Sequence, residues 1–425
     1  MSVEVSRRMK RALPVIALAL APLGCSDSTD IPEIKSNLSR EQRPDVTPAE
    51  LGELVKGNAQ LAADVYHLAG AAERGNLFLS PHSISTALAM TYAGAAGATA
   101  SQMAGALRFT LPEAKLHAGF NALDLALAER AAGAKGETIP FRLTTANSIW
   151  GQDGWEFQAS FLDALAVNYG AGLRVRDFEA DPEGARGDIN HWVEDRTNDR
   201  IQDLIPEGAI TTATRLVLTN AIYFSAAWAD PFEAAETSDR PFFIGGDQQV
   251  VVPALHQRTE YGYAEGAGYR VAELPYDGHQ LSMVVVVPDD LAAFEAGVTG
   301  SRLQEIAASV QRYELDLTLP KFKFDAPLDL KKILQELGMT DAFSGAADFS
   351  RIDGTRRLQI TDVLHKGFIG IDERGTEAAA ATAVIVGETS LPPSATLIVD
   401  RPFVFFIRDR PTGAILFLGR VIDPR

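Results

Sequence analysis

The residue types that most often carry out chemistry are present in this chain, but they are dispersed. The 425 residues contain seven histidines and a single cysteine, Cys25. No two histidines stand three or four positions apart, the spacing that places two metal ligands on one face of a helix. The sequence therefore predicts no metal centre. The histidines are His67, His82, His117, His191, His256, His279 and His365.

Motifs for nucleophilic and cofactor chemistry are also missing from the sequence. It contains no Gly-x-Ser-x-Gly elbow, no phosphate-binding loop and no dinucleotide-binding fingerprint. A Ser–His–acid triad is defined by geometry rather than by spacing, so the sequence leaves that alternative open. We expect a protein that is not an enzyme and that needs no cofactor.

The elements that position these residues mix helices with mostly antiparallel strands. Thr47-Pro48-Ala49-Glu50 is a capping box with proline in the first turn, so a long amphipathic helix is expected after it. A short apolar strand ends at Ser80-Pro81 and a second helix begins there, which makes Ser80, Ser83 and Ser85 helix-capping residues. Strands are predicted at 141–150, 216–224, 271–275, 281–288, 314–324 and 358–372, a helix at 328–337, and a hairpin at 402–407 and 414–421. One large α+β domain fits this pattern.

The composition excludes several kinds of partner. With 46% hydrophobic residues the chain can build a large core, and its formal charge of −17 opposes binding to phosphate backbones. Lys and Arg are scattered, so we expect no nucleic-acid partner. Segment 112–135 lacks the basic cluster that would bind a glycosaminoglycan, and we expect a monomer.

Residues 1–24 resemble a signal peptide. Four basic residues within 7–11 precede an apolar run at 12–23 that is too short to span a bilayer. The run ends in Pro-Leu-Gly-Cys and is similar to a bacterial lipoprotein signal, although Pro22 stands where an aliphatic residue is usual. We expect export, with lipid attachment at Cys25 to the cell envelope; ordinary cleavage that releases the protein, with Cys25 incidental or removed, is the alternative. The polar residues 25–46 are expected to form a flexible tether.

Residues 373–386 have local preferences that disagree with one another. Four consecutive alanines favour a helix, and the Val-Ile-Val that follows favours a strand. After Glu377 the segment holds no charge and no bulky side chain, so it can lie exposed or slide between two strands. A segment whose sequence does not settle its conformation is a candidate moving part.

Four stretches of the chain together resemble the serpin family of serine protease inhibitors. The match extends from about residue 48 to residue 425, and the order and spacing of the stretches make it specific. The stretches are Asn76-Leu-Phe-Leu-Ser-Pro-His-Ser-Ile, Leu218-Thr-Asn-Ala-Ile-Tyr-Phe-Ser-Ala-Ala-Trp228, His365-Lys-Gly-Phe-Ile-Gly-Ile-Asp-Glu-Arg-Gly-Thr-Glu-Ala-Ala, and Arg401-Pro-Phe-Val-Phe-Phe-Ile with residues 413–424.

The resemblance implies a serpin domain at 47–425 with three β-sheets, about nine helices and an exposed reactive-centre loop at about 374–398. In that family a serine or cysteine endopeptidase cleaves the loop and becomes covalently attached to it. The metastable protein then traps the protease by inserting the loop into its largest sheet as a new strand. The partner implied here is therefore a target protease held in a covalent complex.

The resemblance also implies roles for individual residues. In the family, the shutter is the place where sheet strands must part, and the breach is the place where the loop first enters. Ser80, Ser83, Asn220 and His365 match the shutter. Trp228, Lys321 and Glu373 match the breach. The hinge that leads the loop is matched by Glu373, Gly375, Thr376, Glu377, Ala378, Ala379, Ala380 and Ala381.

The hinge composition favours an inhibitor. Alternate residues of a strand face the same side. The set that begins at Thr376 is small or β-branched and uncharged, namely Thr376, Ala378, Ala380, Thr382, Val384 and Val386. Non-inhibitory members of the family often carry a charge or a proline in this hinge. The alternatives are a serpin that acts as a protease substrate or binding protein, and a structural lipoprotein of the envelope.

The family spacing from Glu373 places the scissile bond at Thr389–Ser390, with Val386 and Glu388 as alternatives if the loop is offset. No Lys, Arg or aromatic residue occurs from Ala378 to Asp400, so trypsin-like and chymotrypsin-like proteases find no side chain for their pockets. We expect an elastase-like or subtilisin-like target, whereas cleavage after Glu388 would indicate a glutamate-specific protease.

N-terminal sequencing of the fragment released by the target protease checks this assignment. A new terminus at Ser390 is expected because small and hydroxyl side chains occupy the bond. A new terminus that follows an arginine would contradict it.

Overall fold

The computed structural model describes residues 31–133, 142–245, 248–376 and 392–425. Contacts divide the chain into Met1–Ile31 and Pro32–Arg425, and every element below belongs to the second unit. The helices are α1 (Pro48–Ala72), α2 (Pro81–Tyr92), α3 (Gly97–Ala106), α4 (Glu113–Gly133), α5 (Ala159–Tyr169), α6 (Pro182–Arg196), α7 (Leu291–Ala296), α8 (Gly300–Ser309), α9 (Leu330–Glu336) and α10 (Ser350–Asp353). Short 3₁₀ turns are η1 (Ala234–Glu236) and η2 (Asp341–Phe343).

The strands form two sheets in the described residues. Seven strands follow the order β1-β4-β3-β5-β13-β12-β11. In the other sheet eight strands follow β14-β10-β7-β8-β9-β15-β16-β2, and β6, the ninth, pairs with β7. The first set is β1 (Glu33–Ile34), β3 (Arg142–Gln152), β4 (Leu173–Arg176), β5 (Leu216–Ala227), β11 (Phe322–Asp329), β12 (Val363–Asp372) and β13 (Gly375–Thr376). The second set is β2 (Leu77–Leu79), β6 (Ser238–Gly245), β7 (Gln248–Gly266), β8 (Tyr269–Pro275), β9 (Leu281–Pro288), β10 (Gln311–Pro320), β14 (Ser394–Ile398), β15 (Phe403–Asp409) and β16 (Ile415–Val421).

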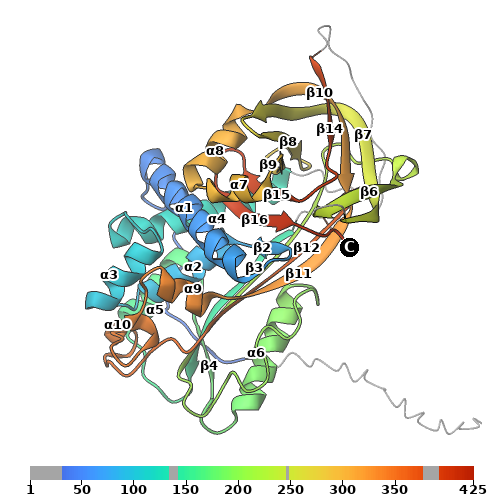
Figure 1. Cartoon of the computed structure of the whole chain (residues 1–425). Coiled ribbons are helices and arrows are strands. Elements are labelled where there is room, and N and C mark those ends of the chain that lie inside the picture. The colour runs from blue at the N-terminus through green and yellow to red at the C-terminus, as the bar shows by residue number, and fades with distance from the viewer. Residues whose placement is uncertain (1–30, 134–141, 246–247, 377–391) are drawn as a thin grey trace, which may run out of the picture. The chain divides into compact units, whose positions relative to one another are not determined.

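The seven-stranded sheet is covered by helices on both faces (Figure 1). Asn147 of β3 hydrogen-bonds Ser83 of α2, whereas Trp150 of the same strand packs edge-on against Trp192 of α6. These two β3 residues are three positions apart and therefore point to opposite faces of the sheet. Burial on both faces explains why β5 is a nearly continuous apolar run, as the sequence indicated.

The long strand β7 connects what the resemblance implied to be two separate sheets. Its first residues pair with β6, its middle, Ala254–Tyr263, pairs with β10, and its end, Gly262–Gly266, pairs with β8. Hydrogen bonding therefore joins three expected sheets into two. The ten α-helices of the described residues and the mixed sheets agree with the expected α+β fold.

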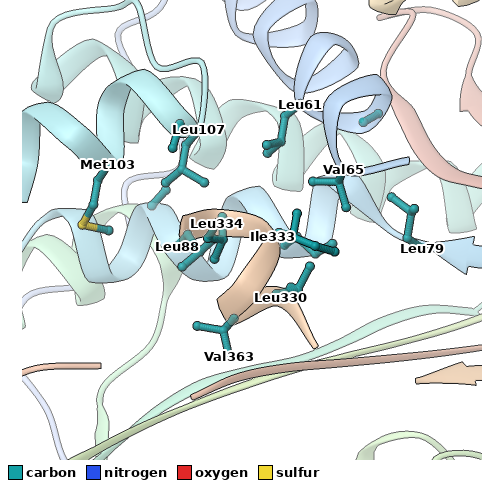
Figure 2. Close-up of a cluster of buried hydrophobic side chains, with 14 of the residues drawn as sticks. Leu61, Val65, Leu79, Leu88, Met103, Leu107, Leu330, Ile333, Leu334 and Val363 are labelled. Carbon is teal, nitrogen blue, oxygen red and sulfur yellow. The ribbon is translucent and has the colours of Figure 1, made fainter. Parts of the chain in front are cut away.

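The core beneath the seven-stranded sheet is apolar and closely packed (Figure 2). Leu330, Ile333 and Leu334 of the short helix α9 are buried in one cluster with side chains of α1, α2 and α3, and Val363 of β12 belongs to the same cluster. Burial of each such side chain stabilises the fold by about 1.5–3 kcal/mol. This cluster holds the start of β12 against the helices.

The two predicted helix starts are confirmed. The Thr47 hydroxyl accepts a hydrogen bond from the Glu50 N–H, and the Glu50 carboxylate accepts one from the Thr47 N–H. Ser80 caps α2 by accepting a hydrogen bond from the Ser83 N–H, whereas Ser83 and Ser85 lie inside the helix and are not caps. Both signals are local, because the cap and its partner are three residues apart.

Three expectations from the sequence are wrong in detail. The strand expected at 314–324 is two strands, β10 and β11, which are interrupted at Lys321. The helix expected from residue 328 begins only at Leu330, because β11 continues to Asp329. The strand expected from residue 358 begins at Val363.

The expected flexible tether at 25–46 is also wrong for its second part. Residues 32–46, called the strap below, contain β1 and lie against β4, α4 and α5. Backbone pairing of Glu33–Ile34 with Leu173–Arg174 fixes the segment in spite of its polar composition. Among the described residues, no helix has the length and apolarity needed to cross a membrane.

Candidate functional site

Two neighbouring strands of the seven-stranded sheet, β5 and β12, are paired along only part of their length. Leu218–Ile222 of β5 pairs in parallel with Val363–Gly367 of β12. Further along, β13 lies between them and pairs antiparallel with both. We call this boundary the slot: β13 occupies one end, and direct β5–β12 pairing closes the other.

The chain enters the slot through a tight turn after β12. Asp372 pairs with Gly375, so Glu373 and Arg374 form the turn, and its carbonyl groups accept hydrogen bonds from the N–H groups of Phe232 and Trp228. Gly375 and Thr376 pair with Ala227 and Ala226 of β5. The expectation of an exposed loop at about 374–398 is therefore wrong at its ends, because β13 is buried and 394–398 form β14.

Close approach to β5 explains the glycine in the hinge. A Cβ atom at Gly375 would lie 2.1 Å from the carbonyl oxygen of Ala226, too close for any side chain. Thr376 is only 1% exposed, and its hydroxyl lies 2.8 Å from the hydroxyl of Tyr276. A small polar residue therefore fits this position, as the alternation in the sequence indicated.

An aromatic pair forms the floor under the occupied end of the slot. The rings of Trp228 and Tyr276 are stacked with centroids 4.7 Å apart, and both residues are buried. The Trp228 indole N–H donates to the carbonyl oxygen of Asp372 at 3.0 Å. Burial raises the pKa of Tyr276, so its hydroxyl stays protonated and available to Thr376.

An ion pair holds the turn above this floor. The Lys321 ammonium lies 2.9 Å from both carboxylate oxygens of Glu373, and the Thr237 hydroxyl donates to the same carboxylate at 2.9 Å. Burial acts to raise the pKa of Glu373, but the hydrogen bonds from Lys321 and Thr237 outweigh burial and leave it lowered. Lys321 occupies the break between β10 and β11, so the break in the strand places the cation here.

A row of polar side chains crosses the closed end of the slot. Asn147 of β3 pairs with Asn220 of β5, and Asn220 pairs with His365 of β12. His365 Nδ1 lies 2.5 Å from Asn220 Oδ1, and His365 Nε2 accepts the N–H of Ser80. The proton must therefore be on Nδ1, which donates to Asn220. Burial lowers the pKa of His365 to about 3, so the ring is neutral.

The start of α2 completes this polar row. The Asn220 amide donates to Ser83 Oγ and to Asn147 Oδ1, both at 2.8 Å. The Ser80 hydroxyl donates to the carbonyl oxygen of Leu416 at 2.7 Å. Four residues predicted from the sequence thus lie together, and Asn147 is a fifth member that the sequence analysis missed. β3 also carries other polar residues, so Asn147 has no distinctive local signal.

The described residues that form the slot hold no side chains arranged for acid–base or nucleophilic catalysis. His365 is neutral, fully hydrogen-bonded and 1% exposed, and no group of three potential metal ligands occurs among the described residues. What the slot offers instead is backbone hydrogen bonding. Two strand edges already accept the residues of β13 at one end and are joined by few pairs at the other.

Several predicted residues lie outside the part of the chain that the structure describes. They stay predictions from the sequence. They are the hinge residues Glu377, Ala378, Ala379, Ala380 and Ala381, the scissile-bond residues Val386, Glu388, Thr389 and Ser390, and the lipidation residue Cys25.

Comparison with known proteins identifies this arrangement. A family model described as serpin (serine protease inhibitor) matches residues 56–424. The chain belongs to the serpin family. Uncleaved ovalbumin superposes on this serpin with a TM-score of 0.78 at 25% identity, covering 88% of this chain and 100% of ovalbumin. The predicted family and fold are confirmed.

Curated relatives match along nearly the whole serpin domain. Leukocyte elastase inhibitor of Bos taurus is 38% identical over 384 residues, which cover 88% of this chain and all of that protein. An uncharacterized serpin-like protein of Thermococcus kodakarensis is 38% identical over 368 residues, covering 85% of this serpin and 84% of the relative. The first of these relatives is named as an inhibitor of a protease.

Lys321→Ala is expected to destabilise the turn above the slot. Glu373 would lose its counter-ion while half-buried, at a cost of about 1–2 kcal/mol given the partial exposure of the lysine. The freed hinge should then move deeper into the slot, or pair with another molecule, without cleavage. Native gels and residual inhibitory activity during incubation measure the rates of both events.

Lys332→Ala, at an exposed lysine of α9, is the control and should behave as wild type. Equal rates of spontaneous insertion and polymer formation in Lys321→Ala and wild type would refute a role for the ion pair.

The buried His365 makes stability depend on pH. Its folded pKa, about 3, lies below the value of about 6.5 for an unfolded chain, so between these values only the unfolded chain takes up the proton. The contribution of neutral His365 to the free energy of unfolding is full above about pH 6.5. It is lost progressively toward pH 3, by about 1.4 kcal/mol per pH unit. His365→Gln should show a correspondingly shallower fall in denaturation midpoint.

His82 and His117 are also buried with lowered pKa values, so the difference between wild type and variant isolates His365. His191→Gln, at an exposed histidine, should keep the wild-type slope. Identical slopes for His365→Gln and wild type would contradict this prediction.

Proposed function

We propose that this serpin is an inhibitor that traps its target protease by inserting the cleaved loop into the slot. The catalytic residue of the protease attacks the carbonyl carbon on the N-terminal side of the scissile bond and forms an acyl-enzyme. The amine on the other side of the bond leaves. The loop then enters between β5 and β12 as a new strand and carries the attached protease with it.

The observation that carries this proposal is the position of β13. Gly375 and Thr376 pair with strands on both sides, so the first residues of the hinge already occupy the slot in the uncleaved chain. The next residues in the sequence are small, and the alternate residues that would face the core carry no charge. Continued insertion therefore extends pairing that has already begun.

Backbone hydrogen bonding supplies the driving force. A loop strand paired on both edges would form about 15–20 backbone hydrogen bonds, each worth about 0.5–1.5 kcal/mol net. The gain is on the order of 10 kcal/mol or more. Against it stand the five residue pairs of β5 with β12 and the His365–Asn220 hydrogen bond, which must break. The balance favours insertion once cleavage frees the loop.

The loop composition supports an elastase-like or subtilisin-like target. Residues 378–400 offer only small, aliphatic, hydroxyl, proline and acidic side chains to the specificity pocket of a protease. The relative from Bos taurus is named for leukocyte elastase, and it shares 38% of aligned residues with this chain. Export and lipid attachment at Cys25 remain part of the proposal and rest on the sequence of residues 1–25 alone.

Incubation with pancreatic elastase or subtilisin tests the function. A complex of inhibitor and protease that survives boiling in detergent is expected, because the acyl bond is covalent. Loop cleavage should also raise the thermal unfolding temperature, because the inserted strand adds backbone hydrogen bonds. Cleavage with neither complex nor added stability would favour a substrate, binding or structural role.

Thr376→Arg tests the mechanism within the same assay. An arginine cannot be accommodated at a buried position beside Tyr276, so the loop of this variant should not insert. The variant should fold, but the protease should cleave it as a substrate and leave. Thr396→Arg places the same side chain on the exposed strand β14 and should remain an inhibitor. Undiminished trapping by Thr376→Arg would overturn insertion through the slot.

A further inference from the structure

The strap, residues 32–46, is a built part of this structure that lies outside the range matched by the serpin family model. At its start it adds a strand to the edge of the seven-stranded sheet. Glu33 and Ile34 pair with Arg174 and Leu173 of β4, and the Val175 N–H donates to the carbonyl oxygen of Pro32. The strap therefore binds the outermost strand on the β5 side of the slot.

The other end of the strap is fastened to helices. The Glu41 N–H donates to the Val167 carbonyl oxygen in α5. The Arg40 guanidinium donates to Asn121 at 2.7 Å and to Asp124 at 2.6 Å, and both of these residues belong to α4. The strap thus links β4, near one edge of the seven-stranded sheet, to the helix α4.

Asn121 shows how completely α4 accommodates the strap. Its side chain is fully buried, its oxygen accepts the Arg40 N–H, and its amide donates to the Glu41 carbonyl oxygen at 2.7 Å. A buried amide without partners costs about 1–3 kcal/mol. Strap residues supply most of the hydrogen bonds of Asn121, so this buried residue of α4 depends on the strap for its partners.

The loop between α5 and β4 leaves room for the strap by lacking side chains. A Cβ atom at Gly172 would lie 2.5 Å from Lys35 Cγ and 2.7 Å from the Ile34 carbonyl oxygen. The Gly172 N–H donates to the Glu33 carboxylate at 2.9 Å. Close approach of the strap therefore requires glycine at this position.

The strap binds the sheet at the level where the slot is closed. Ile34 pairs with Leu173, Leu173 with Ile149, and Ile149 with Leu218. Leu218 in turn pairs with Val363 across the slot. The paired residues of β1, β4, β3, β5 and β12 thus form one continuous row across the sheet, and the strap supplies its last strand on the β5 side of the slot. The hinge at Ala226 is eight residues further along β5, or about 26 Å at 3.3 Å per residue.

Loop insertion must disturb this row. A new strand between β5 and β12 separates them by a further strand spacing, about 4.8 Å. β3 and β4 are hydrogen-bonded to β5 and to each other, so they move with it. α4 lies outside the sheet. The strap joins β4 to α4 and must therefore stretch or detach when the slot opens.

We propose that the strap restrains the β4 edge of the sheet and slows insertion of the loop. This inference rests on the proposed function, and it adds a control on that function. The strap holds the closed end of the slot shut from outside, while the His365–Asn220 hydrogen bond holds it from within. Detaching the strap lowers the barrier to insertion.

Two variants weaken the attachment of the strap at different points. Gly172→Ala places a methyl group against Lys35 and Ile34 without changing any strap residue, and Gly345→Ala, where a Cβ meets nothing within 4 Å, is its control. Arg40→Ala removes the hydrogen bonds to Asn121 and Asp124 of α4 but keeps the one from Asn121 to Glu41, and Arg43→Ala removes an exposed arginine three residues away as its control. Hydrogen exchange at the Val175 N–H reports whether β1 has left β4.

The full chain is mixed with subtilisin, and insertion is followed by tryptophan fluorescence in stopped flow. Both strap variants should insert about tenfold faster than wild type, equal to about 1.4 kcal/mol of barrier. They should also be consumed in fewer copies per trapped protease, because faster insertion leaves less time for deacylation. The two controls should match wild type.

Insertion at wild-type speed or slower in Arg40→Ala, or in a Gly172→Ala variant whose Val175 N–H has lost protection, overturns the restraint by the strap. That failure is distinct from failure of the proposed function. In the latter case wild type itself is cleaved without any fluorescence change or gain in thermal stability, and no strap variant alters that result.

Discussion

The hydrogen bond between His365 and Asn220 joins two strands that a new strand would separate under the proposed function. It lies in a polar row that also contains Asn147, Ser80 and Ser83, where every side chain has a partner. Buried polar groups are costly when left unsatisfied, so such a row is stable only while its geometry is complete. The core helices α2 and α9, the capping of α2 and the placement of β16 all serve to keep this row intact.

The opposite end of the same slot obeys a different constraint. There the first hinge residues already lie between the strands, Gly375 allows contact with β5, and Thr376 contacts the hydroxyl of Tyr276, which directly follows β8. Trp228 and Tyr276 keep their stacked positions under it. One end of the slot thus resembles the state after insertion and the other the state before it. The two arrangements coexist in one sheet because different groups stabilise them. The ion pair at Glu373 acts at one end and the polar row at the other, about 20 Å apart along β5 at 3.3 Å per residue.

The sequence was informative wherever the cause was local. The capping box at Thr47, the cap at Ser80 and the buried strand at 216–224 depend on neighbours a few positions away, so their signals lie within short stretches. Asn147 was missed because its partner Asn220 is set by strand register, which no local pattern reveals. The polar composition of the strap predicts a tether, but its order comes from β4, Gly172 and Asn121, all far away in the sequence. The family resemblance located His365 and Lys321, whose roles depend on contacts over long distances.

The slot can accept only one additional strand. Its two edges belong to β5 and β12, and a single strand paired to both would leave no open edge between them. Under the proposed function, a molecule with an inserted loop would have to break the backbone hydrogen bonds on both edges of that strand before the slot could open again. Under the proposed function each copy acts once, so the protection that a cell obtains is counted in molecules rather than in turnovers. New synthesis, and not affinity, would then set how long a protease remains under control.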